Sequence, residues 1–217
     1  MDNIRVILST NRVIPVVLLK HEDDLAPLCE ALLDGGIKII EITLRTPNAI
    51  NAIDKAVKHF PELTVGAGTI VSADQISQVL DAGAHFGVTP GTTSELIDAA
   101  LQSGFPLLPG GSTVSEFMVL ERLGFTVLKF FPALPAGGLA FLKSLKGPLP
   151  NIVFCPTGGI NSENFLDYLA LNNVLAIGGS WFVNDELIGR RAWSEVTSEA
   201  VSICKKIKIG RISEIKR

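Results

Sequence analysis

A chain of 217 residues, 47% hydrophobic and 19% charged, is large enough to bury a sizeable core, which excludes a disordered protein. The formal net charge of -3 argues against a dedicated nucleic-acid binder, and no apolar run approaches the roughly 20 residues that a membrane-spanning helix needs. The N-terminal sequence lacks the pattern of a secretory signal, and Cys29, Cys155 and Cys204 form neither a disulfide pattern nor a CxxC pair. We therefore expect a cytoplasmic protein that binds neither nucleic acid nor a membrane.

Short runs rich in β-branched residues alternate with segments of helical periodicity along the whole chain. From Leu25 to Leu33, for example, apolar residues recur at the spacing of one helix face. The apolar runs predict eight strands, at Val13–Leu18, Ile37–Ile42, Leu63–Val65, Phe86–Val88, Pro106–Leu108, Thr126–Phe130, Ile152–Phe154 and Val174–Ile177.

Helix boundaries are indicated by local residue pairs and by glycines. Capping-box spacing at Ser72–Gln75, Thr92–Glu95 and Thr113–Glu116 predicts three helix starts. Glycines that follow helical runs predict left-handed residues at helix ends, at Gly35, Gly83, Gly104 and Gly124.

Repeated strand–helix units give parallel strands joined by right-handed crossovers, and eight units close into a barrel. We therefore expect an α/β protein in which residues 1–217 form a single (β/α)8 TIM-barrel domain, with a short N-terminal helix and a C-terminal helix. An open, doubly wound sheet is the alternative. The tail Lys205–Arg217 carries six basic residues and one Glu, which is typical of a solvated helix end.

Two charged residues interrupt apolar strands, Glu41 within Ile39–Arg45 and Lys129 within Val127–Pro132. An unpaired buried charge costs several kcal/mol, so each side chain needs a partner or a role. Both lie near the carboxyl ends of strands two and six, which face each other across an eight-stranded ring. A desolvated amine can attack a carbonyl carbon while a carboxylate moves protons. The alternative is a structural salt bridge, or a side chain that extends past its strand end.

Two glycine pairs follow the last two predicted strands. The segment Pro156–Ile160 precedes a helix expected near Asn161, and Gly178–Ser180 precedes one expected near Asn184. Backbone N–H groups at such loops and helix starts bind anions, and phosphate sites recur at this place in barrels. We therefore expect a phosphate site there, although glycine pairs also occur as simple turns. The segment Gly66–Thr69 lies at the same mouth or forms a tight turn.

No metal or cofactor is expected from the pattern of ligand residues. His21, His59 and His85 are far apart, and no GxGxxG spacing indicates a dinucleotide. Cys155, beside the first glycine pair, is interpreted as a small buried hydrophobic residue.

A set of motifs in a fixed order resembles a known family from about Ile14 to Phe182. The motifs are Glu41-Ile-Thr-Leu-Arg45-Thr, Val65-Gly-Ala-Gly-Thr69, Thr89-Pro90-Gly91, Lys129-Phe-Phe-Pro132, Phe154-Cys-Pro-Thr-Gly-Gly159-Ile and Gly178-Gly-Ser180-Trp181. They resemble the bacterial 2-keto-3-deoxy-6-phosphogluconate (KDPG) and 4-hydroxy-2-oxoglutarate (KHG) aldolases, class I aldolases of the Entner–Doudoroff route. The resemblance implies cleavage of KDPG to pyruvate and glyceraldehyde 3-phosphate, with cleavage of KHG to pyruvate and glyoxylate as a second activity.

The resemblance also implies roles for individual residues. It makes Lys129 the Schiff-base lysine and Glu41 the acid/base, without a metal or cofactor. It places Arg45, Thr69 and Pro90 around the pyruvate part of a keto-acid phosphate substrate. It assigns the phosphate to Gly158, Gly159, Gly179 and Ser180, and it implies a homo-oligomer, commonly a trimer.

Some residues depart from the family pattern, and other functions remain alternatives. Gly111 stands where a larger apolar residue is usual, and Leu134-Pro135 replace a more polar pair, so the acceptor aldehyde stays open. Thr157 is more typical of the gluconate type than of enzymes for the galactonate epimer. The alternatives are a phosphosugar isomerase or epimerase with Glu41 as base, and a non-catalytic sugar-phosphate sensor.

Overall fold

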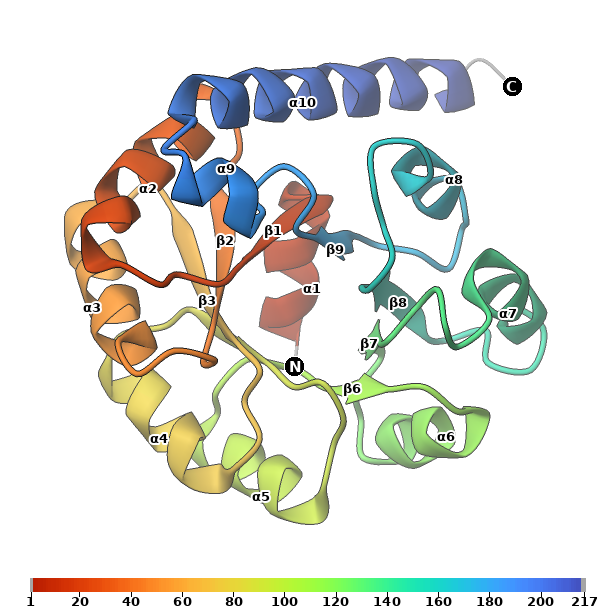
Figure 1. The fold of residues 1–217 in the computed structure, drawn as a ribbon. Coiled ribbons are helices and arrows are strands. Elements are labelled where there is room, and N and C mark those ends of the chain that lie inside the picture. The colour runs from red at the N-terminus through yellow and green to blue at the C-terminus, as the bar shows by residue number, and fades with distance from the viewer. Residues whose placement is uncertain (1, 216–217) are drawn as a thin grey trace.

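In the computed structural model, which describes residues 2–215, parallel strands curl around a buried interior and helices cover their outer side (Figure 1). The strands are β1 (Val13–Val17), β2 (Ile39–Thr43), β3 (Thr64–Gly68), β4 (Phe86–Val88), β5 (Leu107–Leu108), β6 (Gly110–Gly111), β7 (Val127–Phe130), β8 (Val153–Pro156) and β9 (Ile177–Gly179). The helices are α1 (Asp2–Thr10), the 3-10 helix η1 (Glu22–Asp24), α2 (Leu25–Asp34), α3 (Ala49–His59), α4 (Ala73–Asp81), α5 (Ser94–Ser103), α6 (Val114–Arg122), α7 (Gly138–Leu145), α8 (Phe165–Leu169), α9 (Asp185–Gly189) and α10 (Trp193–Ile215). No helix within residues 2–215 is long and apolar enough to cross a membrane.

The strands form two parallel sheets whose order follows the chain. One sheet has the order β5-β4-β3-β2-β1-β9 and the other the order β6-β7-β8. Strands β5 and β6 belong to one region of chain that Pro109 divides, since proline has no N–H to donate to a ladder. Isolated bridges join Phe154 to Val174 and Thr157 to Gly178, and so connect the β8 and β9 regions. The predicted α/β class with a curled parallel sheet is confirmed, but the continuous eight-stranded ladder of the prediction is divided in two.

Apolar side chains on the inner faces of the helices pack against the outside of this sheet. Helix α3 illustrates the pattern: Ala49, Ala52, Ile53 and Ala56 are all buried at helical spacing, while the opposite face is polar. Small alanines at these positions let the helix lie close to the strands. Every residue of β2 is buried, as expected for a strand that is covered on both faces.

Helix α1 lies at the amino ends of the strands, opposite the end where parallel barrels keep their active sites. Its residues Ile4 and Leu8, one helical turn apart, are buried in the core. Arg5 donates a hydrogen bond of 3.2 Å to the hydroxyl of Thr126, which precedes β7. Helix α1 therefore packs against the amino end of the barrel and leaves the carboxyl end to the loops that follow the strands.

Helix α10 packs on α2 along the apolar face of its first half, formed by Val196, Ala200 and Ile203. A Cβ atom at Gly35 would lie 2.3 Å from Cβ of Ala200, so the close packing of these helices requires glycine there. The sequence predicts a left-handed residue at Gly35, which is wrong because Gly36 adopts that conformation (φ 84°). The basic tail continues α10 to Ile215, and its last two residues lie outside the described part of the chain.

The predicted helix starts are largely correct. Thr113 and Glu116 form a complete capping box at the start of α6, with hydrogen bonds in both directions. The predicted start at Thr92 is one residue early, because Thr93 caps α5. Thr92 instead donates its hydroxyl proton to the carbonyl of Gly110, 2.8 Å away, and so ties the end of β4 to β6.

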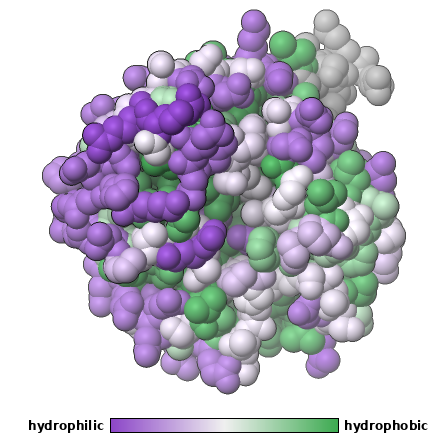
Figure 2. Space-filling view, in the orientation of Figure 1, coloured by the Kyte–Doolittle hydropathy of each residue, from purple (hydrophilic) through white to green (hydrophobic). Residues whose placement is uncertain are grey.

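The molecular surface differs between the two halves of the face seen in Figure 1. Hydrophilic side chains predominate over α2 and α9, whereas hydrophobic and intermediate side chains are mixed over the region of α6 to α8 (Figure 2). Large apolar side chains exposed on α6 are Val114, Met118 and Val119.

Candidate active site

Lys129 and Glu41 meet inside the barrel from strands of different sheets. Nζ of Lys129, on β7, lies 3.4 Å from Oε1 of Glu41, on β2. Both residues are nearly inaccessible, with exposed fractions of 5% and 2%. Because the apolar interior excludes water, each charge depends on the other as its partner, and an amine and a carboxylate stand ready for proton exchange.

Two further neighbours of the amine, besides Glu41, are an aromatic ring and a thiol. Nζ lies 5.3 Å from the ring centroid of Phe131, and Cys155 of β8 is paired with Lys129 in the ladder. Burial raises the pKa of the Cys155 thiol to about 12, while the neighbouring Lys129 acts in the opposite direction. A thiol with this pKa stays protonated, so Cys155 serves as a small neutral wall of the site, in agreement with its interpretation from the sequence.

Arg45 and Ser180 line one cavity of about 240 Å³ at the mouth of the barrel, together with Val17, Thr43 and Asp185. Arg45 lies two residues beyond β2 and Ser180 directly after β9, the two strands that flank β1 in the sheet. The hydroxyl of Thr43 donates to the carbonyl of Val17 at 2.8 Å and so fixes this wall of the cavity. The arrangement offers an exposed guanidinium and a hydroxyl to an anionic ligand.

Thr69 and Pro90 follow the ends of β3 and β4 at the same side of the barrel. Thr69 adopts a left-handed backbone conformation (φ 59°), which is strained for a β-branched residue. Strained backbone conformations of this kind occur most often at functional sites. Pro90 follows Thr89, whose buried hydroxyl accepts a hydrogen bond of 2.9 Å from the N–H of Gly110. Hydrogen bonding thus holds the turn at Pro90 against β6, the strand beside Lys129.

The loop after β8 contains two consecutive left-handed glycines. Gly158 and Gly159 both have positive φ, 100° and 80°, which only glycine adopts easily. The helix predicted near Asn161 begins later, at Phe165. The side-chain oxygen of Asn161 instead accepts hydrogen bonds from the N–H groups of Glu163 and Asn164, 3.0 and 3.2 Å away. The glycine loop itself, rather than a helix N-terminus, therefore lies at this point.

The second glycine pair is a strand and not the loop that the sequence predicts. Gly178 and Gly179 belong to β9 and pair with Ile14 and Pro15 of β1. The bridge between Thr157 and Gly178 places the end of β9 beside the loop after β8. The two parts of the expected phosphate site are therefore adjacent.

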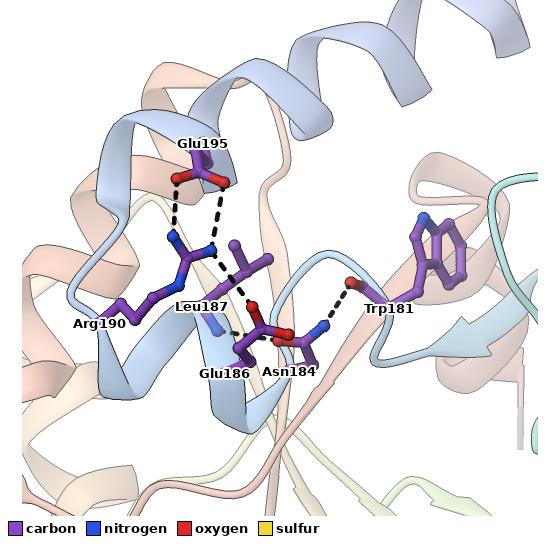
Figure 3. A network of polar contacts seen from close by, with 6 residues as sticks. All are labelled: Trp181, Asn184, Glu186, Leu187, Arg190 and Glu195. Carbon is purple, nitrogen blue, oxygen red and sulfur yellow. Dashed lines mark hydrogen bonds and ion pairs between the residues drawn. The ribbon is translucent and has the colours of Figure 1, made fainter.

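The segment after Ser180 is organised by its own side chains (Figure 3). Asn184 caps α9, accepting from the N–H of Leu187 at 2.9 Å, and donates to the carbonyl of Trp181 at 3.1 Å. Arg190 bridges Glu186 and Glu195 in the same network. Asn184 and acidic residues thus occupy the start of α9, and Ser180 lies exposed just before this network.

Sequence reasoning missed two contributors to this site. Phe131 is part of a quoted motif, but nothing in its spacing indicates a ring over the amine of Lys129. Thr89 shows no pattern that predicts its bond to Gly110. Within residues 2–215, no three His, Cys, Asp or Glu residues come together as metal ligands.

Comparisons with known proteins agree on one family. A sequence profile described as KDPG and KHG aldolase matches residues 4–199. The KHG/KDPG aldolase of Escherichia coli K12 is 43% identical over 194 residues, which are 89% of this chain and 91% of that protein. The KDPG aldolase of Legionella pneumophila, solved with pyruvate captured as a covalent carbinolamine, is 44% identical with a TM-score of 0.89, covering 91% and 96% of the two chains. The KDPG aldolase of Zymomonas mobilis ZM4, solved with 3-phosphoglycerate, is 37% identical with a TM-score of 0.88, covering 93% and 94%.

Proposed function

The chain belongs to the KDPG and KHG aldolase family, and we propose that Lys129 and Glu41 carry its carbon–carbon bond cleavage. It is a lyase that acts through a Schiff base, cleaving KDPG to pyruvate and glyceraldehyde 3-phosphate. Family membership sets aside the isomerase and the non-catalytic sensor. The contact of 3.4 Å between Nζ of Lys129 and Oε1 of Glu41, inside an apolar barrel, is the observation that supports these two roles.

The reaction begins with formation of the Schiff base. The unprotonated amine of Lys129 attacks the keto carbon C2 of the substrate and gives a carbinolamine. Glu41, within hydrogen-bond reach of that nitrogen, delivers the proton with which the carbinolamine hydroxyl leaves as water. The product is an iminium, whose positive nitrogen withdraws electrons from C3.

Cleavage follows from this electron sink. The carboxylate of Glu41 removes the proton of the 4-hydroxyl, the bond between C3 and C4 breaks, and its electron pair moves into an enamine. Glyceraldehyde 3-phosphate leaves with C4 as its aldehyde carbon. Protonation of the enamine at C3 and addition of water to the resulting iminium then release pyruvate and free Lys129.

Substrate binding is assigned to the mouth of the barrel. Arg45 pairs with the carboxylate of the pyruvate part, and Thr69 and Pro90 enclose that part. Gly158, Gly159, Gly179 and Ser180 hold the phosphate, through N–H groups of the glycine loop and the hydroxyl of Ser180. Support comes from the shared cavity of Arg45 and Ser180, and from the positive φ of Gly158 and Gly159.

The assembly and the cellular setting are part of the proposal. We propose a single-domain enzyme of the cytoplasm that assembles as a homotrimer, as the family resemblance implies. The apolar side chains on α6 are exposed, from 37% at Val114 to 56% at Val119. Their exposure supports the proposal that a second subunit covers this surface.

Reductive trapping tests the proposed chemistry directly. Incubation with pyruvate and borohydride should add one pyruvate-derived mass to the peptide that contains Lys129. Lys129→Ala and Lys129→Arg should lose labelling and cleavage, because neither side chain forms a Schiff base, whereas Lys146→Ala, on the exposed surface, should retain both. A chelator should leave activity unchanged. Label on a different lysine would overturn the assignment.

A further inference from the structure

The side chain of Leu134 occupies the space next to Gly159 although more than half of it is exposed. A Cβ atom at Gly159 would lie 2.4 Å from Cβ and 2.8 Å from Cδ2 of Leu134. The exposed fraction of Leu134 is nevertheless 56%, which is high for a large aliphatic side chain. Leu134 thus contacts the glycine loop from the side of the mouth rather than from the core.

The backbone around Leu134 runs against the same loop. The N–H of Ala133 donates to the carbonyl of Thr157 at 2.8 Å, and the N–H of Leu134 donates to the carbonyl of Gly158 at 2.9 Å. These bonds fix two carbonyl groups of the loop and leave the N–H groups of Gly158 and Gly159 outside this contact. The Leu134 side chain then covers the Cα of Gly159.

This contact matters because of the conformation that the loop adopts. Two consecutive glycines with positive φ have many alternative conformations, so ordering them in one conformation is costly in entropy. A side chain that fills the space beside Gly159 removes alternatives in which the loop moves towards Leu134. The N–H groups are then already aligned when an anion arrives, and preorganised donors bind with less loss of freedom.

We propose that Leu134 is a positioning residue that holds the Gly158–Gly159 loop in its anion-binding conformation and so sets the preference for a phosphorylated substrate. The inference rests on the proposed function, since it assumes that this loop binds the substrate phosphate. Leu134 touches the loop and not the reacting carbons. Its loss should therefore weaken binding of the phosphate and leave the chemistry at Lys129 intact.

The test compares two substrates in variants of one exposed leucine. Leu134→Ala should raise KM for KDPG roughly tenfold, the effect expected from freeing one or two ordered groups. It should weaken competitive inhibition by inorganic phosphate by a similar factor. Cleavage of KHG, which has no phosphate, and pyruvate labelling of Lys129 should stay within about twofold. Leu134→Met, which refills the space, should restore KM, and Leu80→Ala, on α4 and 41% exposed, is the matched control.

The outcomes separate this inference from the proposed function. If Leu134→Ala keeps the wild-type KM for KDPG and the wild-type inhibition by phosphate, the role of Leu134 is wrong while the phosphate site stands. If Leu134→Ala impairs KDPG and KHG equally, the residue has a general structural role and the inference fails. If wild type itself shows no preference for KDPG and no inhibition by phosphate, the phosphate site and the inference fall together, although trapping of Lys129 can still succeed.

Discussion

A Cβ atom at Gly68 would lie 2.2 Å from Oε1 and 2.7 Å from Cγ of Glu41, so the Glu41 side chain occupies the space that any side chain at Gly68 would need. Gly68 ends β3 and pairs with Thr43, two residues beyond Glu41 on the neighbouring strand. The carboxylate therefore lies across β3 on its way to Lys129. Because Gly68 has no side chain, the Glu41 carboxylate can occupy this position beside β3.

Gly68→Ala should displace the carboxylate from Lys129 and reduce kcat. A misplacement of about 1 Å can cost on the order of 100-fold in rate, so we expect a loss between about 10-fold and 100-fold. Pyruvate trapping should become slower but remain on Lys129. Steady-state kinetics and the rate of borohydride trapping measure both effects. Gly147→Ala, where a Cβ atom meets nothing within 4 Å, is the control, and a Gly68→Ala variant as active as wild type would contradict the argument.

Glu41→Gln should slow turnover by roughly 10²- to 10⁴-fold, because it removes general acid–base catalysis. The amide is close in shape to the carboxylate, so binding of pyruvate and of substrate should change little. A purely structural ion pair predicts the opposite pattern, with a large loss of stability and normal turnover in the protein that remains folded. Measuring kcat, KM and the thermal unfolding temperature on the same preparation distinguishes a catalytic role of Glu41 from a structural one.

Much of the fold can be predicted because strand burial leaves a simple pattern. Parallel strands that are covered on both faces must be apolar, so an apolar run such as Ile37–Ile42 predicts a buried strand. A charged residue within such a run is then easy to recognise as exceptional. The division at Pro109 could not be predicted with the same certainty. Whether a proline ends a strand or only interrupts it depends on the neighbouring strands. Here β5 pairs with β4 in one sheet, while the backbone N–H of Lys129 donates to the carbonyl of Pro109 and ties the chain to β7 in the other.

Some parts of the candidate site can likewise be predicted from the sequence, whereas others depend on contacts between distant residues. The convergence of Glu41 and Lys129 follows from counting strands, because opposite strands of a ring project side chains into one interior. The glycine pairs are ambiguous, since the same residue serves in turns and in tight packing. Gly179 allows the ring of Trp181 to pack closely, because a Cβ atom there would lie 2.0 Å from that ring. This contact exists only in the folded chain, so the sequence does not indicate it.

The capping box of α6 should make stability depend on pH in the acidic range. Hydrogen bonds from the N–H groups of Ser112 and Thr113 and from the Thr113 hydroxyl lower the pKa of the Glu116 carboxyl below its ordinary value of 4.5. The charged form is thus favoured in the folded state. Its contribution to stability is present above the unfolded-state pKa and is lost as the pH falls through the lower folded-state pKa.

Glu116→Ala should therefore lower the unfolding temperature near pH 7 by about 2 °C, corresponding to about 0.5–1 kcal/mol for hydrogen bonds at an exposed position. The difference from wild type should shrink as the pH falls through the lowered pKa of Glu116, where wild type also loses the carboxylate. Thermal unfolding of both proteins from pH 3 to pH 7 measures this. Glu199→Ala, on the exposed side of α10, controls for the loss of one surface charge. A difference that stays constant with pH would show that the charge of Glu116 does not contribute.

Ser180→Ala tests the phosphate site with little disturbance of the fold. Ser180 is exposed and follows β9, so the variant removes one hydroxyl and leaves the strand intact. A hydrogen bond to a charged group contributes about 1.5–3 kcal/mol, so kcat/KM for KDPG should fall by about tenfold or more. Cleavage of KHG should change by less than about twofold, because its product glyoxylate carries no phosphate.

The comparison variant is Gly179→Val, one residue earlier. Its side chain would collide with the ring of Trp181, so it should reduce stability and impair both substrates together. Ser180→Ala removes a phosphate contact alone and should give a selective loss, whereas Gly179→Val disturbs both the packing on Trp181 and the phosphate site and should give a general loss. If Ser180→Ala lowers kcat/KM for KDPG and KHG by the same factor in a protein of normal stability, the hydroxyl does not bind the phosphate, and that part of the proposed site is wrong.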